Sequence, residues 1–222
     1  MRCIPADLIS HNNFVHPFTC FISGSSGCGK TTFCEKLITS NRISNLENGQ
    51  FKSIHYFHPE ELDEPPVDWA EEFDEIPVSY HNYLPTVDFF QSVKKDSLIC
   101  FDDDFYRLSN YDIFAKSFRV FARKYSFSIL VITQSYFEGR RHARTIRVNC
   151  DVHVLLSSYG DSRTNLRAAR SLGYEETFKE AARDAYSQPF GHVIIFTGSK
   201  ILNNKLRVQT GFFSEYENYC YC

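Results

Sequence analysis

The sequence lacks the apolar runs that membrane proteins and secreted precursors carry. The longest strongly apolar stretch in the middle of the chain covers residues 128–133, whereas a membrane-spanning helix needs about 20 residues. The N-terminus has no apolar run after a basic start, as a signal peptide would have. The chain also has no internal repeat and no low-complexity tract. We therefore expect a soluble, intracellular protein that has no membrane partner.

An excess of positive charge is also missing. The chain of 222 residues has 24 Lys and Arg against 27 Asp and Glu, a formal net charge of −3. A protein that grips nucleic-acid phosphates over its whole surface would be clearly basic, so any such contact must be local. Hydrophobic residues make up 43% and aromatic residues 16%, enough to fill one α/β core. We expect a single domain over residues 1–222, with its core at about 14–213.

The eight cysteines have neither metal-site nor disulfide spacing. There is no CxxC pair, and Cys220-Tyr221-Cys222 alone lacks the spacing of a zinc site. Cys28, Cys34 and Cys100 lie in a glycine-rich loop, the helix after it and an apolar strand, where a thiol acts as a small apolar filler. A free Cys28 thiol indicates a reducing compartment, either cytoplasm or nucleus.

Strands and helices are expected to alternate along most of the chain. Segment 59–75 has nine carboxylates and no Lys or Arg, which predicts a solvated loop with a short helix. The expected strands, whose ranges are given below, are too apolar to have a solvent-exposed face. They therefore predict a mainly parallel sheet with helices on both faces. Residues 192–197 and 205–210 flank Gly198-Ser199-Lys200 and predict a C-terminal β-hairpin. The expected strands are 18–23, 51–58, 97–101, 128–133 and 151–157, and the expected helices are 30–39, 112–125 and 165–172.

A glycine-rich loop after the first strand carries the strongest chemical signal. Glycines let the backbone turn tightly and aim successive N–H groups at phosphate oxygens, at the positive end of the following helix. Lys30 would bridge the β- and γ-phosphates, and the Thr31 hydroxyl would complete a Mg²⁺ shell. The loop therefore predicts an ATP site of the P-loop (Walker A) type in a RecA/ASCE-like fold. Its expected nucleotide-binding residues are Gly24, Ser25, Ser26, Gly27, Cys28, Gly29, Lys30, Thr31 and Thr32.

A second motif supplies the carboxylates that ATP hydrolysis needs. Strand 97–101 ends in three aspartates, as a Walker B strand does. Asp102 would hold Mg²⁺ and Asp103 would orient or deprotonate the attacking water. Asp104 leaves the register open, because a slip of one residue would make Asp103 and Asp104 the pair. Gln134 closes the next apolar strand, where it would lie beside the γ-phosphate and report its presence.

The order of these motifs resembles the FtsK–HerA superfamily of DNA-pumping ATPases. The order is Walker A, Walker B, a helix with Arg123-Lys124, and a strand that ends in Thr133-Gln134. The discriminating parts are the sensor Gln134 and the Arg-rich segment 144–150 after it. Within that superfamily, segment 16–31 is similar to the poxvirus-type genome-packaging ATPases of large DNA viruses, virophages and Polinton or adintovirus elements. The resemblance covers roughly residues 14–213.

The resemblance implies a motor that packages double-stranded DNA into a capsid. It implies a homo-oligomeric ring, pentamer or hexamer, that docks on a capsid portal or vertex. It also implies an arginine that a neighbouring subunit supplies to the γ-phosphate. Arg123 is the first candidate, because it lies just ahead of the sensor strand, and Arg163 and Arg147 follow.

Positive charge is concentrated after the sensor strand. Residues 119–170 include ten Lys or Arg and three acids in a chain that is net negative. Basic loops there could track a DNA backbone without reading bases, although a solvated basic loop explains the pattern equally well. The expected DNA contacts are Arg140, Arg141, Arg144 and Arg147.

Other interpretations fit parts of the sequence. A helicase, or another DNA-dependent ATPase that does not package DNA, shares the same motifs. A P-loop nucleotide kinase could use residues 139–144 as a phosphate-clamping lid, but the Walker B aspartates favour a hydrolase. A regulatory GTPase is excluded, because segment 204–207 lacks the aspartate that selects guanine. A non-catalytic adaptor is disfavoured, since every expected chemical position is intact.

Overall fold

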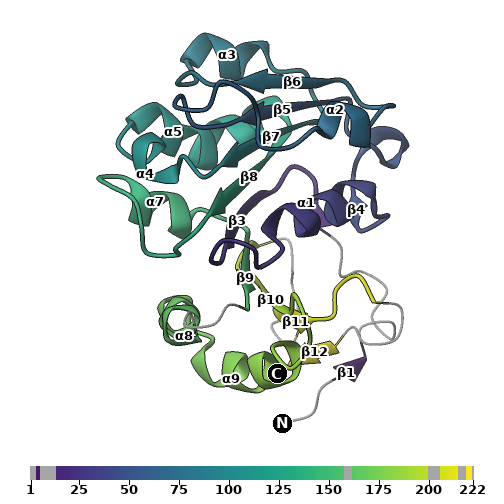
Figure 1. The fold of residues 1–222 in the computed structure, drawn as a ribbon, viewed down its shortest axis with the longest axis vertical. Coiled ribbons are helices and arrows are strands. Elements are labelled where there is room, and N and C mark those ends of the chain that lie inside the picture. Colours follow the sequence, from purple (N-terminus) through teal and green to yellow (C-terminus); the bar gives the residue numbers. More distant parts are fainter. Residues whose placement is uncertain (1–3, 6–13, 158–161, 200–205, 215–218, 222) are drawn as a thin grey trace.

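The fold is built on one long sheet that runs through the whole molecule (Figure 1). The computed structural model describes residues 4–5, 14–157, 162–199, 206–214 and 219–221. The strand order is β1-β12-β11-β10-β9-β3-β8-β7-β5-β6. The strands of this sheet are β1 (Ile4–Pro5), β3 (Thr19–Ser23), β5 (Ser53–Phe57), β6 (Val78–His81), β7 (Ser97–Asp102), β8 (Phe127–Thr133), β9 (Val152–Leu156), β10 (His192–Phe196), β11 (Val208–Thr210) and β12 (Tyr219–Tyr221).

Parallel and antiparallel pairing divide this sheet into two parts. Strands β6, β5, β7, β8, β3 and β9 run parallel to their neighbours, whereas β10, β11, β12 and β1 pair antiparallel. The expected mainly parallel sheet is therefore confirmed, and so is the antiparallel pairing of β10 with β11. The second strand of this hairpin, β11, is shorter than the expected strand 205–210. Residues 200–205 of the expected hairpin lie outside the described residues. Two further strands, β2 (Phe14–Val15) and β4 (Ile43–Ser44), form a small parallel pair.

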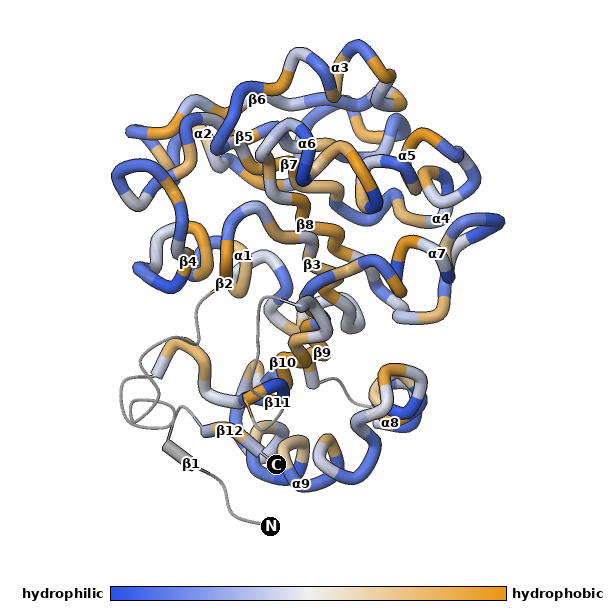
Figure 2. Tube along the Cα trace, turned by 180° about the vertical axis from the view of Figure 1, so that it is seen from behind, coloured by the Kyte–Doolittle hydropathy of each residue, from blue (hydrophilic) through white to orange (hydrophobic). Residues whose placement is uncertain are grey.

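Helices cover both faces of the sheet, as the apolar strands predict. Side chains alternate along each central strand: in β8, Ile129 and Val131 join one core, while Leu130 and Ile132 join the other. Helix α1 packs on the second core through Phe33 and Leu37. Figure 2 shows β7 and β8 as hydrophobic segments between more polar surface helices. The helices are α1 (Lys30–Thr39), α2 (Trp69–Glu72), α3 (Val87–Ser92), α4 (Phe105–Leu108), α5 (Asp112–Lys116), α6 (Ala122–Tyr125), α7 (Ala143–Val148), α8 (Ser162–Ser171) and α9 (Glu175–Ala185), with a 3₁₀ turn at Glu47–Gly49.

Several expected elements differ in detail. The expected helix 112–125 is α5 and α6 joined through a π-helical turn at Ser117–Phe121. The expected strand 51–58 begins two residues later, and β7 is one residue longer than expected because Asp102 still pairs with Ile132 of β8. Sequence reasoning missed β6, α3 and α9. Strand β6 and helix α3 are short, whereas α9 buries Phe178, Ala181 and Ala185 at helical spacing, a signal that could have found it. No helix of the described residues is long and apolar enough to cross a membrane.

The arrangement of the parallel strands positions the predicted motifs. Strand β8 lies between β3 and β7, and parallel strands end at the same edge of a sheet. The glycine-rich loop after β3, the aspartates after β7 and Gln134 after β8 therefore meet at one edge. Open α/β sheets bind their ligands outside the carboxyl ends of their strands.

Candidate active site

The glycine-rich loop folds around its own cysteine. The Gly24 N–H donates to the Thr133 carbonyl at 3.2 Å, so the start of the loop is still tied to β8. A Cβ at Gly24 would lie 2.6 Å from the Cys28 Sγ atom, which no side chain tolerates. The Cys28 side chain is buried under the loop and contributes packing, so only its backbone faces a ligand. Ser26 and Gly27 at the top of the loop are exposed.

The loop also concentrates positive charge at the start of α1. Gly29 caps this helix with a φ of 93°, a left-handed conformation that favours glycine. The Lys30 ammonium is buried in the concave side of the loop, where Nζ donates to the carbonyls of Gly24 at 2.8 Å and Ser25 at 3.1 Å. A helix N-terminus and an ammonium at one point form a ready anion site. Thr31 is half-buried and Thr32 is exposed on the first turn.

One pocket of about 420 Å³ joins the predicted motifs. It lies between the loop, the end of β7 and the acidic segment after β5. The pocket brings Thr31 together with Asp102 and Asp103, although both aspartates are more than seventy positions from Thr31 in sequence. Asp104 does not line it. The lining residues are Ser26, Gly27, Gly29, Lys30, Thr31, Thr32, Pro59, Leu62, Pro66, Asp102, Asp103 and Phe190.

Asp102 is held at the buried end of β7. Its side chain accepts a hydrogen bond from the Tyr56 hydroxyl of β5. Burial raises the pKa of Asp102 to about 6, and the Tyr56 hydrogen bond and the nearby Lys30 charge oppose that rise. Burial also raises the pKa of Tyr56, so this residue remains a donor. Sequence reasoning missed Tyr56, since its contact with Asp102 exists only because β5 pairs with β7.

The donor set suits Mg²⁺ bound together with a phosphate. Thr31 and Asp102 offer a hydroxyl and a carboxylate, hard oxygen donors of the kind that Mg²⁺ takes one or two at a time alongside phosphates and waters. Within the described ranges, no group of three or more His, Cys, Asp or Glu side chains could hold a metal ion alone. The residues present therefore fit a metal that enters with its nucleotide.

Asp103 and Gln134 meet across the ends of β7 and β8. The Gln134 Nε2 atom donates to Asp103 Oδ2 at 3.1 Å, and both residues are exposed at the pocket edge. Asp103 has a φ of 48°, a left-handed conformation that is uncommon outside glycine and typical of functional sites when it occurs. Asp104 instead pairs with Arg107, whose Nε atom lies 2.9 Å from each carboxylate oxygen. The geometry favours Asp102 and Asp103 over the slipped register.

Glu138 is a further carboxylate near this edge that the motifs did not single out. It accepts a hydrogen bond from the Thr133 hydroxyl at the end of β8. Burial raises the pKa of Glu138, and the charge of Asp103 raises it further, while Lys30 acts in the opposite sense. The only sequence signal was that Glu138 is one of three acids in the basic region 119–170. Its position among Thr133, Asp103 and Lys30 makes it part of the site's electrostatics.

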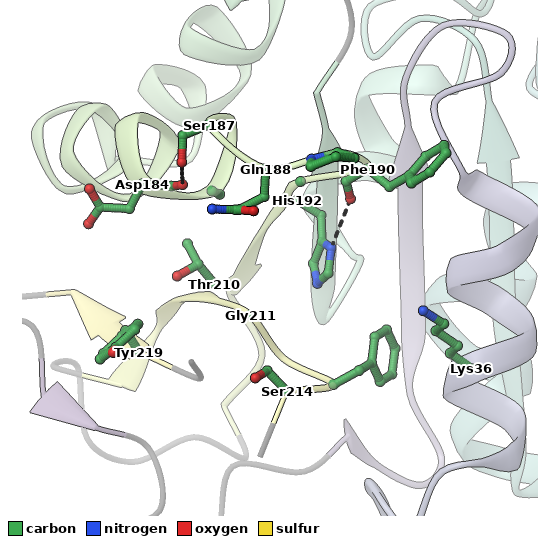
Figure 3. Close-up of a pocket in the computed structure, with 14 residues that line it drawn as sticks. Lys36, Asp184, Ser187, Gln188, Phe190, His192, Thr210, Gly211, Ser214 and Tyr219 are labelled. Atoms are coloured by element: carbon green, nitrogen blue, oxygen red, sulfur yellow. Dashed lines mark hydrogen bonds between the residues drawn. The ribbon is translucent and has the colours of Figure 1, made fainter. Parts of the chain in front are cut away.

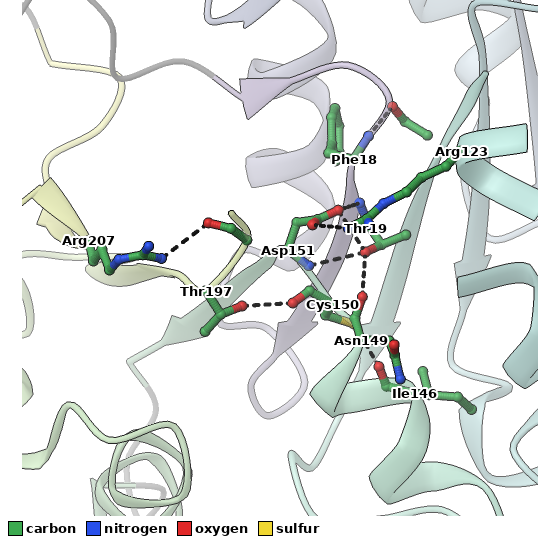
Figure 4. Close-up of polar contacts among 11 residues, drawn as sticks. Phe18, Thr19, Arg123, Ile146, Asn149, Cys150, Asp151, Thr197 and Arg207 are labelled. Carbon is green, nitrogen blue, oxygen red and sulfur yellow. Dashed lines mark hydrogen bonds and ion pairs between the residues drawn. The ribbon is translucent and has the colours of Figure 1, made fainter. Parts of the chain in front are cut away.

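Arg123 lies at the opposite edge of the sheet from the loop of its own chain (Figure 4). It belongs to α6 and lies near the amino ends of the parallel strands, four residues before β8 starts. Its Nη2 atom is 3.2 Å from Asp151 Oδ1, and Asp151 is itself held by the Thr19 N–H at 3.0 Å. The Arg123 side chain is 61% exposed. Arg123 lies before the amino end of β8, whereas the glycine-rich loop follows the carboxyl end of the parallel neighbour β3, so Arg123 is separated from its own loop by the length of the strands. Arg163 is exposed on the first turn of α8, next to residues outside the described ranges.

The four arginines after the sensor strand divide into two kinds. Arg140, Arg141 and Arg144 are exposed. The first two lie on a loop that is anchored where the Arg140 N–H donates to Ser109 Oγ at 2.6 Å, and Arg144 lies on the first turn of α7. Arg147 is half-buried and donates to the Glu138 carbonyl at 3.0 Å, close to the Tyr136 ring. Burial lowers the pKa of Arg147. The first three arginines thus face solvent, whereas Arg147 is turned inward.

A strand, a glycine-rich loop and a helix at the edge of a parallel sheet define the fold of P-loop NTPases. No protein-family model and no curated protein matches this sequence. Among solved structures, the chain is similar to the genome-packaging NTPase B204 of Sulfolobus turreted icosahedral virus 2 with sulfate: 11% identity, TM-score 0.56, 82% of this chain and 92% of that chain covered. B204 in complex with ATP-gammaS matches at 10% identity with a TM-score of 0.53, covering 86% of this chain and 95% of that one.

The B204 DNA-packaging ATPase from Sulfolobus Turreted Icosahedral Virus gives the same result. It matches at 14% identity with a TM-score of 0.53, over 84% of this chain and 96% of that chain. At such identities the likeness concerns the fold. The chain therefore has an α/β fold with a large, mostly parallel sheet, similar to a viral packaging ATPase over nearly the whole length of that protein.

Proposed function

We propose that this protein is an ATPase motor that translocates double-stranded DNA, and that it packages a viral genome into a capsid. One observation carries the proposal: the ends of β3 and β7 bring Lys30, Thr31, Asp102 and Asp103 to a single pocket of about 420 Å³. This set contains each part that phosphoryl transfer to water requires, namely phosphate binding, metal ligands and a carboxylate for the water.

The chain's own residues divide the work of hydrolysis. The loop N–H groups and Lys30 bind the β- and γ-phosphates, and Thr31 and Asp102 would hold Mg²⁺, which neutralises charge on those phosphates. Asp103 accepts a hydrogen bond from the attacking water, whose oxygen bonds to the γ-phosphorus as the bond to the bridging oxygen breaks. The water proton passes to the carboxylate or to the released phosphate. Gln134 keeps Asp103 oriented through their hydrogen bond at 3.1 Å.

An arginine from a neighbouring subunit would complete the site. Arg123 faces outward at the edge opposite its own loop, as a residue that serves another subunit must. Sharing an arginine in this way needs a head-to-tail interface between identical subunits, which closes into a ring; a pentamer or a hexamer is the assembly that we propose. Arg163 is the alternative candidate, being exposed on α8.

Local positive charge supports DNA as the polymer along which the motor moves. Arg140 and Arg141 are exposed on an anchored loop that follows the sensor strand, and Arg144 is exposed on the first turn of α7, so a change at Gln134 lies only a few residues from them. Contacts of this type bind phosphates without regard to base sequence. The fold likeness to a viral genome-packaging NTPase adds support from an independent direction. The proposal places the protein in a reducing compartment of the host cell, with a capsid portal or vertex as its docking partner.

The test measures ATP hydrolysis and DNA movement on material whose oligomeric state is known. We expect double-stranded DNA to stimulate hydrolysis, and the motor to displace a triplex-forming strand from a duplex without separating the duplex. The Asp103→Asn variant is the control, since it keeps the phosphate loop intact. Strand separation would instead indicate a helicase, and phosphate transfer to a nucleotide would indicate a kinase. Absence of DNA-stimulated hydrolysis by an assembled ring would refute the proposal.

A further inference from the structure

Phe190 is an aromatic residue in an unusual position. It lies between α9 and β10 and is 66% exposed. Its backbone has a φ of 56°, a left-handed conformation that is rare for a bulky residue and clusters at ligand sites. The surrounding structure must impose this conformation.

Neighbouring contacts hold the Phe190 backbone in place, and Figure 3 shows one of them, in which the His192 Nδ1 atom lies 3.4 Å from the Phe190 carbonyl oxygen. The Gly191 N–H donates to the Gln188 carbonyl at 3.2 Å, and the Gly191 carbonyl accepts from the Ser157 N–H at 2.8 Å. A Cβ at Gly191 would lie 1.9 Å from the Ala185 carbonyl oxygen, so the turn is too tight for any other residue. The next residue, His192, packs its ring against Phe33 of α1, with centroids 5.1 Å apart. The turn is therefore fixed relative to α1.

The Phe190 ring lies directly against the phosphate loop. A Cβ at Gly29 would lie 3.0 Å from Phe190 Cδ1 and 3.4 Å from its Cβ, so the ring covers the junction between the loop and α1. Phe190 lines the pocket of about 420 Å³ that holds the predicted phosphate ligands. It also lines an adjoining pocket of about 100 Å³ between α1 and β10. That pocket is formed by Gly29, Thr32, Phe33, Lys36, Leu156, Phe190, His192 and Phe213.

The position of Phe190 matches the path of a bound nucleotide. With its phosphates in the loop, a nucleotide must carry its ribose and base past the first turn of α1, where Thr32 and Lys36 are exposed. Phe190 stands at the exit of that path and belongs to both pockets. The adjoining pocket is lined mainly by aromatic and aliphatic side chains, an environment suited to the flat apolar face of a base and not to phosphate.

We propose that Phe190 is the stacking platform for the base of the bound nucleotide, whose edge enters the pocket of about 100 Å³. This inference rests on the proposed function of the phosphate loop, and it assigns a separate subsite that the motifs do not predict. Stacking of a base on an aromatic side chain changes affinity by about 10- to 100-fold. Binding of the phosphates alone does not involve the ring.

Inorganic tripolyphosphate separates the two subsites, because it has the phosphates of ATP and no base. The dissociation constants of ATP and tripolyphosphate are measured with Mg²⁺ for the full chain and for Phe190→Asn. Asparagine removes the ring but tolerates a positive φ, so this variant should fold, as circular dichroism would verify. Phe190→Trp keeps a stacking ring. Tyr83→Ala, at an aromatic residue 48% exposed and outside both pockets, is the matched control.

We expect Phe190→Asn to weaken ATP binding by about 10- to 100-fold and to leave tripolyphosphate binding unchanged. Phe190→Trp and Tyr83→Ala should bind both ligands as the unmodified chain does. Unchanged ATP affinity in Phe190→Asn would overturn the inference. Equal weakening of both ligands would also overturn it, since the ring would then act on the loop through Gly29. If the unmodified chain binds neither ligand, the proposed function of the loop is itself wrong.

Discussion

Replacing Asp102 by Asn should abolish hydrolysis and, at neutral pH, stabilise the fold. Asp102 is only 8% exposed, and burial raises its pKa from 3.8 to about 6. A difference of about two pKa units corresponds to about 3 kcal/mol at roughly 1.4 kcal/mol per unit. This is the free energy that the folded protein loses by keeping a buried carboxylate ionised. An asparagine carries no charge and can still accept the hydrogen bond from Tyr56.

The sign of the effect fixes its pH dependence. A carboxylate whose folded pKa lies above its unfolded pKa favours folding at low pH, and that contribution is lost as pH rises through the folded value. The difference between Asp102→Asn and the unmodified protein should therefore be small near pH 4, grow between pH 4 and 6, and level off above about pH 7. Its plateau should approach about 3 kcal/mol.

Denaturant unfolding between pH 4 and 8, in a chelator and without nucleotide, measures this difference. Asp103→Asn is the matched control, because Asp103 is exposed and its neighbour in sequence. Its charge is a lesser cause of the raised Asp102 pKa than burial, so we expect Asp103→Asn to stabilise the fold much less than Asp102→Asn. The reasoning would be refuted if Asp102→Asn were less stable than the unmodified protein at pH 8. A pH-independent gain would also count against it, since the cause would then be packing and not charge.

Three further results are expected. Lys30→Ala should abolish ATP binding, because Lys30 is the side-chain cation inside the loop; isothermal titration checks this, and micromolar binding by the variant would contradict it. Hydrolysis should rise steeply with protein concentration, since an arginine from a neighbouring subunit is worth about 10³–10⁵ in rate. Mixing Arg123→Ala with Lys30→Ala subunits should restore part of the activity. Full activity of Arg123→Ala alone would move the assignment to Arg163 or Arg147. Replacing the three exposed arginines of the basic loop by Ala should weaken binding to all duplexes alike and reduce the salt slope by up to about three. Filter binding at several salt concentrations measures this slope, basal hydrolysis should survive, and an unchanged slope would mean that the loop is only a solvated surface. The three residues are Arg140, Arg141 and Arg144.

The local motifs could be predicted because their physics is local. A loop with three glycines before Lys30 has few other uses, and α1 occupies the expected residues 30–39. The central strands were predicted for a similar reason, since runs such as 128–133 are too apolar for any position except the middle of a covered sheet. Prediction was poorer for β6, α3 and α9. These segments are stabilised by elements that lie next to them in the fold, and the sequence does not show which elements those are.

The sequence by itself determined the fold class, the phosphate loop and the aspartates that follow β7, because glycine conformation, helix capping and apolar runs act over a few residues. Only the tertiary structure decided which side chain donates a hydrogen bond to each of these carboxylates. Pairing of β5 with β7 gives Asp102 its Tyr56 donor, and pairing of β7 with β8 places Gln134 beside Asp103. The same holds for Phe190, which reaches Gly29 across 161 positions of sequence. Contacts of that range depend on strand order, and strand order follows from how two apolar faces are buried together by the whole chain.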